Sequence, residues 1–113
     1  MALPPLTRQL ADHLLGAFCV RRSPADLRDQ VRVSHTVRGN TVTIHEHRVA
    51  WDDPRSWTVT KVAVVQYDPA DGTWELFGFD SNARLRTYPA RQTADLSALL
   101  AEIDDDPTGI FWG

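Results

Sequence analysis

Period-two alternation of apolar and polar residues runs from Val31 to Tyr88, interrupted only by short turns. This period is typical of strands that bury one face, and turns this short join antiparallel neighbours. The first two segments, residues 31–38 and 41–50, flank Gly39-Asn40, a dipeptide that tolerates positive φ and suits a two-residue hairpin. The alternation therefore restricts the chain to an antiparallel meander whose first register is set by this turn. The register pairs Val31 with Arg48, Val33 with Glu46, His35 with Ile44 and Val37 with Val42.

Helical patterns on either side of the strands complete the expected fold. A stripe of apolar residues indicates a first helix, Ser23-Pro24 indicates a short helix with a hydroxyl cap, and Thr93 caps a last helix after Pro89. The expected elements are helices over 5–20 and 24–29, strands over 31–38, 41–50, 57–67, 74–79 and 84–88, and a helix that ends at residues 104–107. The apolar stripes are Leu6, Leu10, Leu14, Ala17 and Phe18 in the first helix, and Leu96, Leu99, Leu100 and Ile103 in the last.

These elements predict one α+β domain over residues 1–113, because strands in series between helices are typical of that class. We expect a five-stranded, mostly antiparallel meander sheet with the first and last helices packed on one face. The hydrophobic content of 42% is enough for a core at this length without disulfides. Cys19 is the single cysteine, which excludes an internal disulfide and a multi-cysteine zinc site.

The charge balance and the absence of targeting patterns restrict partners and location. A net charge of −3 disfavours a surface that follows nucleic-acid phosphates, although a local basic patch leaves such a partner open. No stretch approaches the ~20 apolar residues of a membrane span, and the first residues lack the pattern of a signal peptide. We therefore expect a cytoplasmic protein with no membrane partner. No phosphate-binding loop or nucleophile elbow is present, so we expect no cofactor.

Three polar side chains, Glu46, Arg48 and His35, fall on the sheet face that the valines mark as buried. Glu46 and Arg48 are two residues apart on one strand face and close enough to pair, and a buried charge needs such a partner. One interpretation is a structural ion pair, with His35 as a hydrogen-bonded core histidine. The other is a cleft in which Glu46 or His35 is a general base and Arg48 stabilises an anionic transition state.

Two further groups of side chains are candidates for binding. His45 and His47 share the exposed face, but the hairpin register places no third ligand beside them, so we expect no metal site. Aromatic and arginine side chains of the later strands interleave, which indicates a small surface for dimerisation or partner binding. A turn at Ser81-Asn82 places Phe77 opposite Arg86 and Phe79 opposite Arg84. The binding candidates are Trp51, Phe77, Phe79, Arg84 and Arg86.

Several separated patterns resemble one known family over nearly the whole chain. The patterns are Phe18-Cys19 with Arg22 and Pro24, Ile44-x-Glu46-x-Arg48-x-x-Trp51, Val62-Ala63 with Tyr67, Trp74 spaced to Tyr88, and Gly109-x-Phe111-Trp112-Gly113. They resemble a family of small bacterial proteins known as domain of unknown function 3024. The chain has Val49 where the family pattern has proline, and Val64 where it has lysine. The resemblance implies kinship and carries no activity.

Two functions remain after these exclusions. We expect a non-enzymatic, cytoplasmic protein-interaction module whose partner is another protein or a second copy of the chain, as a homodimer through exposed sheet surface. The alternative is a small, nuclease-like hydrolase that uses Glu46, Arg48 and His35 in one cleft. Nucleic acid is the less favoured partner because the chain is acidic overall.

Overall fold

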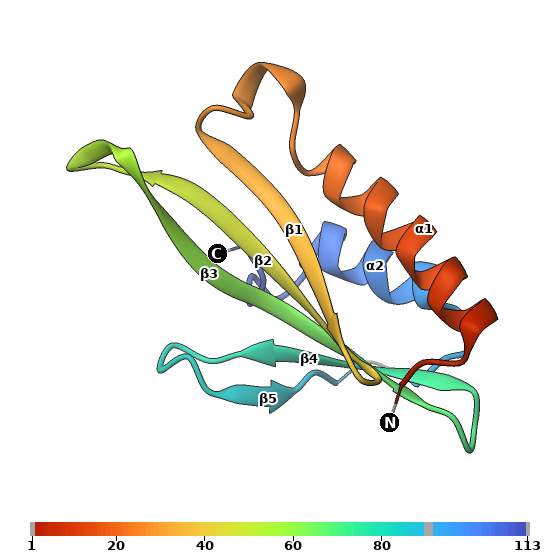
Figure 1. The fold of residues 1–113 in the computed structure, drawn as a ribbon. Helices are drawn as coiled ribbons and strands as arrows, with labels where there is room; N and C mark the ends of the chain where they lie inside the picture. The colour runs from red at the N-terminus through yellow and green to blue at the C-terminus, as the bar shows by residue number, and fades with distance from the viewer. Residues whose placement is uncertain (1, 90–91, 113) are drawn as a thin grey trace.

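The computed structural model describes residues 2–89 and 92–112, which form a five-stranded antiparallel meander flanked by helices (Figure 1). The predicted α+β class and element order are confirmed. Gly113, the end of the terminal sequence pattern, lies outside the described residues. The elements are α1 (Pro5–Arg21), the 3₁₀ turn η1 (Ala25–Leu27), β1 (Val31–Arg38), β2 (Thr41–Ala50), β3 (Asp53–Asp68), β4 (Thr73–Phe79), β5 (Leu85–Thr87) and α2 (Leu96–Asp105).

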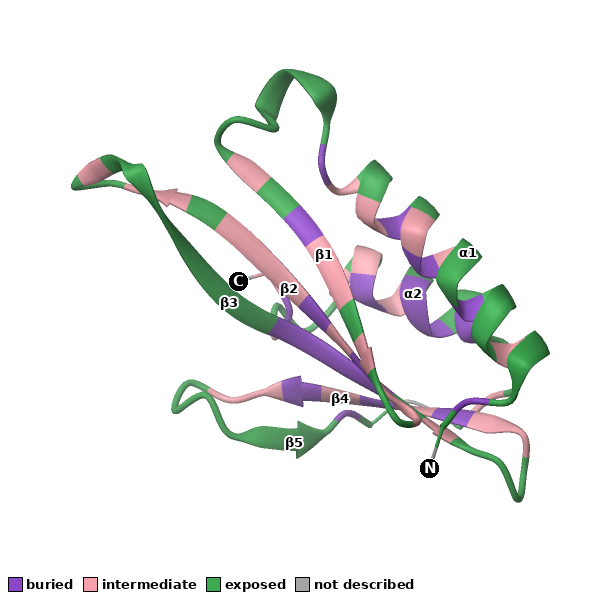
Figure 2. Ribbon diagram, in the orientation of Figure 1, coloured by how far each residue is buried: buried purple, intermediate pink, exposed green. Residues whose placement is uncertain are grey.

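Both long helices cover one face of the sheet, which we call the inner face (Figure 1). The buried residues gather where α1 and α2 meet the strands, whereas residues 54–61 of β3 are exposed and the end of β2 is mostly intermediate (Figure 2). Phe18 of α1, Ile103 of α2 and Ile44 of β2 belong to one core cluster, and none of the three is exposed. Burial of this apolar surface is the main stabilising contribution to the fold. The opposite face of the sheet is called the outer face below.

The hairpin register is the one that the Gly39-Asn40 turn predicts. Gly39 has a φ of 62°, a conformation that glycine adopts without strain. Val33 pairs with Glu46 and His35 with Ile44, so these residues share the inner face. The register places the alternate residues of β1 and β2 on the outer face, among them His45 and His47.

The end of the β2–β3 hairpin extends past β4, although β1 still pairs with β2 as far as Arg48, and we call residues 45–61 the arm. β3 begins at Asp53 rather than near Trp57, because the side chain of Asp53 accepts hydrogen bonds from Arg55 N and Ser56 Oγ and shortens the expected polar connection. β3 pairs with β4 only from Val64 onward. Within the described chain, residues 53–63 of β3 therefore have β2 as their single strand neighbour.

The buried face of α1 differs from the predicted stripe. Leu6 and Leu10 are 80% and 58% exposed, whereas Ala11, Leu15 and Phe18 are buried. Helical spacing alone permits either stripe, since the helix carries apolar residues on more than one face. The stripe that indicated the helix is thus not its buried face: Leu6, Leu10 and Ala17 are exposed, and only Phe18 of the stripe is fully buried.

The caps of the later helices also differ from the predictions. The predicted short helix over 24–29 is only the turn η1, and Ser23 does not cap it. Its hydroxyl accepts from Val33 N at 2.8 Å and lies 3.4 Å from Val33 O. Asp95 rather than Thr93 caps α2, because the backbone of Thr93 pairs with Trp74. Across residues 2–89 and 92–112, no helix is long and apolar enough to cross a membrane.

Candidate functional site

Glu46 and Arg48 form an ion pair at the border of the inner face. Arg48 Nε donates to Glu46 Oε1 at 2.8 Å and Arg48 Nη2 donates to Glu46 Oε2 at 3.3 Å. The hydrogen bond and charge of Glu46 hold the pKa of Arg48 above its usual value. The Arg48 side chain is 60% exposed and that of Glu46 only 17%. The guanidinium thus reaches past the core into solvent, and only the carboxylate is sheltered.

The variant Glu46→Gln tests what this pair contributes. Because Arg48 is solvated, we expect the free energy of unfolding to change by no more than about 1 kcal/mol. Urea unfolding of the wild type, Glu46→Gln and Arg48→Gln measures this change in free energy. Both variants lose the same ion pair, so similar small changes are expected. A fall of several kcal/mol for either variant would mean that the pair holds the strands together.

His35 contacts α1 instead of Glu46. Its Nδ1 lies 3.6 Å from Cys19 Sγ, and its Nε2 lies 3.8 Å from Asp12 Oδ1. Among the described residues no hydrogen bond or ion pair joins His35 to Glu46. Burial raises the pKa of Cys19 to about 11, so the thiol is protonated at neutral pH and is no activated nucleophile. The hydrolase hypothesis stays a prediction, and none of these contacts favours it.

The aromatic and arginine candidates lie at two separate places. Trp51 is at the tip of the arm and is 97% exposed. Phe77 and Phe79 lie on β4, half-buried, opposite Thr87 and Leu85. The predicted pairing of Phe77 with Arg86 and of Phe79 with Arg84 was wrong.

Asp80 is the reason for that shift in register. Its carboxylate accepts from Asn82 N, Arg84 N and Arg86 Nε, which builds a longer loop than a two-residue turn. The hydrogen bond from Arg84 N is the largest cause that lowers the pKa of Asp80. Ala83 in this loop has a φ of 60°. Arg86 is therefore engaged by Asp80 and does not stack on Phe77.

A groove of about 570 Å³ lies between the unpaired edge of β3 and the end of β4, and we call it the β3 groove. Val59 and Lys61 line one side, and Phe79 lines the other. Ile110 and Phe111 of the C-terminal segment also line it. Sequence reasoning found Phe79 but missed the groove, because period-two alternation does not reveal where two strands diverge.

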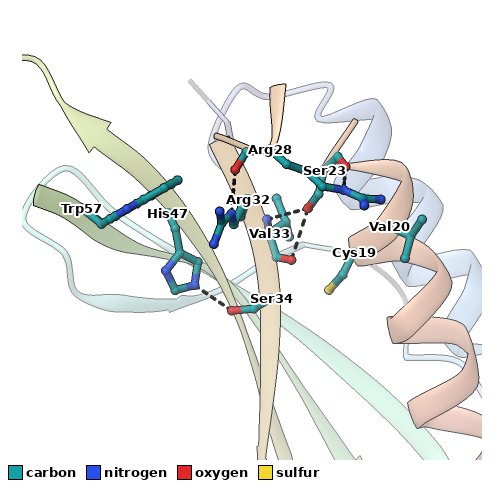
Figure 3. A pocket seen from close by; sticks show the side chains of 9 residues that line it. All are labelled: Cys19, Val20, Ser23, Arg28, Arg32, Val33, Ser34, His47 and Trp57. Carbon is teal, nitrogen blue, oxygen red and sulfur yellow. Dashed lines mark hydrogen bonds between the residues drawn. The ribbon is translucent and has the colours of Figure 1, made fainter. Parts of the chain in front are cut away.

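A second groove, of about 520 Å³, lies over the free edge of β1, and we call it the β1 groove (Figure 3). Ser34 Oγ lies 2.8 Å from His47 Nε2, and the guanidinium carbon of Arg32 lies 4.7 Å from the centre of the Trp57 ring. Figure 3 places His47 and Trp57 on one side of β1 and Cys19 on the other. Of these residues the sequence drew attention only to His47, which was weighed with His45 for a metal; the cross-strand pairing of Arg32 with His47 was the available signal for the groove.

His45 and His47 lie side by side on the outer face, with ring centres 6.4 Å apart. Desolvation lowers the pKa of His45, and the nearby His47 and Lys61 lower it further. Within the part of the chain that the structure describes, no three His, Cys, Asp or Glu residues gather as metal ligands would.

The sequence matches the family described as domain of unknown function (DUF3024) over residues 3–113. The chain belongs to the DUF3024 family. The match spans α1 to the C-terminal segment, so the whole meander with its two helices represents the DUF3024 domain. No curated protein and no solved structure matches the chain. Membership confirms the family resemblance and assigns no activity.

Proposed function

We propose that this chain is a non-enzymatic protein-interaction module that binds an extended segment of a partner protein along the free edge of β3. The observation that carries the proposal is the divergence of β3 from β4, which leaves residues 53–63 paired on one side only within the described chain. An edge strand presents unpaired N–H and C=O groups that a further strand can use. Addition of a strand is a recurrent mode of peptide recognition.

The hydrogen-bond pattern indicates which backbone groups face the partner. Val49 N donates to Gln30 O, so the odd-numbered residues of β2 bond toward β1 and the even-numbered ones toward β3. The backbone N–H and C=O groups of Glu46 and Arg48 therefore form hydrogen bonds with those of their cross-strand partners, Thr60 and Thr58. The residues between these, such as Val59, direct their N–H and C=O groups to the free edge.

The β3 groove supplies side-chain contacts for the bound segment. Val59 is 56% exposed, and Phe79 and Ile110 on the far wall are half-buried. Asp80 at the groove is already engaged by Arg86 at 2.9 Å. The groove therefore favours a segment with apolar side chains at alternate positions, because successive residues of a strand point to opposite faces.

A second copy of the chain is a less favoured occupant of this edge. Pro54, Lys61 and the irregularity in pairing beside Val62 are features by which natural edge strands resist pairing with identical strands. The homodimer is the less favoured proposal, in which exposed sheet surface elsewhere, such as Leu85 of β5, makes the contact. We further propose a bacterial, cytoplasmic protein, as the family resemblance and the composition favour. Nucleic acid is the less favoured partner.

Proline at position 59 tests the edge directly. Val59→Pro removes an N–H that points to the free edge and leaves the β2–β3 hydrogen bonds in place, so the domain is expected to fold. Peptides selected on the wild type from a random library are expected to carry alternating apolar residues. The affinity of these peptides for Val59→Pro should be lower by about tenfold or more, because one hydrogen bond to the peptide backbone is lost and the proline ring obstructs the edge.

Val59→Thr is the matched control, since it keeps the N–H and the β-branched shape, and it should bind as the wild type does. Equal binding to both variants, or a selection that enriches no peptide, contradicts the edge proposal. Sedimentation velocity at several concentrations is expected to give a monomer. A dimer that Val59→Pro abolishes would instead make the second copy the occupant. Salt-sensitive retention on single-stranded DNA would make nucleic acid the partner.

A further inference from the structure

The β1 groove contains two guanidinium groups without an acidic partner. Arg28 and Arg32 both line it, and its lining residues include no carboxylate. Among the described residues neither arginine makes an ion pair, whereas Arg21, Arg22 and Arg48 all do. Figure 3 shows the Arg32 guanidinium beside Trp57 and the Arg28 guanidinium beside Ser23, so both charges face the groove from different places and favour an anion there. The groove is therefore a local concentration of positive charge in a chain whose net charge is −3.

Backbone hydrogen bonds hold both guanidinium groups in place. Arg28 Nε donates to Ser23 O at 3.0 Å, and Arg32 Nε donates to Arg28 O at 2.6 Å. Each bond uses the Nε of its arginine, which leaves the terminal Nη groups to bind a ligand. A planar guanidinium can donate two parallel hydrogen bonds to a carboxylate or a phosphate. Because the side chains are already held, binding costs less conformational entropy than for a free arginine.

The rest of the groove is suited to an apolar body with one polar edge. The Trp57 ring lies 4.7 Å from the guanidinium carbon of Arg32 and offers an apolar surface beside the charge, whereas Val20 lines the groove on the other side of β1 (Figure 3). The Ser34 hydroxyl and the His47 imidazole, 2.8 Å apart, offer hydrogen-bonding groups beside them. A volume of about 520 Å³ falls in the range of small-molecule sites, which combine apolar walls with a few placed polar groups.

We propose that the β1 groove binds a small amphipathic organic anion, an aromatic or aliphatic body that ends in a carboxylate or a phosphate. Arg32 binds the charged group and Trp57 contacts the body, both on the same side of β1 (Figure 3), and Arg28 adds a second positive charge to the groove. Ser34 and His47 hydrogen-bond to a polar substituent. This site is separate from the β3 edge and does not depend on the protein-interaction proposal.

Fluorescence of 8-anilinonaphthalene-1-sulfonate, an aromatic anion, provides the probe for the groove. We expect one site per chain, from which phenyl phosphate and benzoate displace the probe and the neutral analogue benzyl alcohol does not. The ranking of phenyl phosphate against benzoate distinguishes the two anionic groups. Inorganic phosphate alone should displace weakly, since it lacks the body that contacts Trp57.

Arg32→Gln should weaken binding of the probe by about tenfold to a hundredfold, because a charge-assisted hydrogen bond is lost. Arg38→Gln is the matched control, an exposed arginine of the same strand that does not line the groove. When phenyl phosphate is added to the wild type, the NMR chemical shifts of the backbone amides of Ser34, His47 and Trp57 should change. This measurement needs no variant, so it tests the site even if Arg32→Gln does not fold. The proposal is overturned if Arg32→Gln and Arg38→Gln lose the same affinity for the probe, or if benzyl alcohol displaces the probe. It is also overturned if the probe does not bind, or if the amide chemical shifts change only elsewhere in the chain.

Discussion

Replacing Leu15 by alanine is expected to lower the free energy of unfolding by about 2–5 kcal/mol, the usual cost of emptying a buried leucine site. Leu15 is completely buried and belongs to the core cluster that joins α1 to the sheet and to α2. Its loss removes apolar contacts and leaves a cavity that the packed strands can fill only in part. A domain of this size has a total stability of ~5–15 kcal/mol, so the variant is expected to be partly unfolded at moderate urea concentrations.

Leu10→Ala on the same helix provides the matched control. Leu10 is 58% exposed, so its truncation is expected to change the free energy of unfolding by about 0.5 kcal/mol or less. Urea unfolding followed by tryptophan fluorescence and by circular dichroism measures both variants. The opposite ranking, with Leu10→Ala the more damaging, would mean that α1 is rotated on the sheet.

The helix α1 could be predicted from the sequence, but its buried face could not. Leu6, Leu10 and Leu14 recur at a spacing of four, and Ala11, Leu15 and Phe18 form a second stripe beside them. Periodicity establishes that a helix exists, but the choice of its buried face depends on which partner surface it meets. Here the helix faces both β1 and α2, and that packing cannot be read from a window of the sequence.

The sheet was more predictable where turn chemistry is local. Gly39-Asn40 specifies a hairpin register that the structure reproduces residue by residue. Prediction failed at two loops in which aspartate side chains bind the backbone. Asp53 starts β3 early, and Asp80 lengthens the loop that was expected to be a tight turn at Ser81-Asn82. Such side-chain bonds compete with strand pairing and depend on the final geometry.

The candidate sites were harder to predict from the sequence than the helices and strands. Alternation placed Glu46 and His35 correctly on the inner face, but it could not reveal that His35 meets Cys19 while Glu46 meets Arg48. The two grooves arise from larger-scale geometry, namely where β3 leaves β4 and how η1 approaches the free edge of β1. These features depend on sheet twist and on loops far apart in the sequence.

The C-terminal segment is the place where a second large effect is expected. Asp106 ends α2 with a φ of 45°, and its carboxylate accepts from Phe111 N at 3.0 Å and from Trp112 N at 2.9 Å. Trp112 Nε1 donates to Ile103 O at 2.8 Å. These bonds fold the segment back against the sheet, where Phe111 is buried and its ring centre lies 5.0 Å from that of Tyr88.

Gly78 makes the close approach of this segment possible. A Cβ at Gly78 would lie 3.0 Å from Ile110 Cδ1 and 3.5 Å from Phe111 Cε1, closer to Ile110 than side chains usually pack. The glycine in β4 is thus explained by packing, since glycine within a strand often marks such an approach. The apolar end of the chain is therefore part of the core.

Phe111→Ala is accordingly expected to lower the free energy of unfolding by about 3–5 kcal/mol, because a buried aromatic site is emptied and its contact with Tyr88 is lost. Trp51→Ala removes an even larger aromatic side chain, but at the exposed tip of the arm, and should change stability by about 0.5 kcal/mol or less. Urea unfolding of both variants tests the difference. If Phe111→Ala were as stable as Trp51→Ala, the segment would not be docked in solution, and the far wall of the β3 groove would be missing with it.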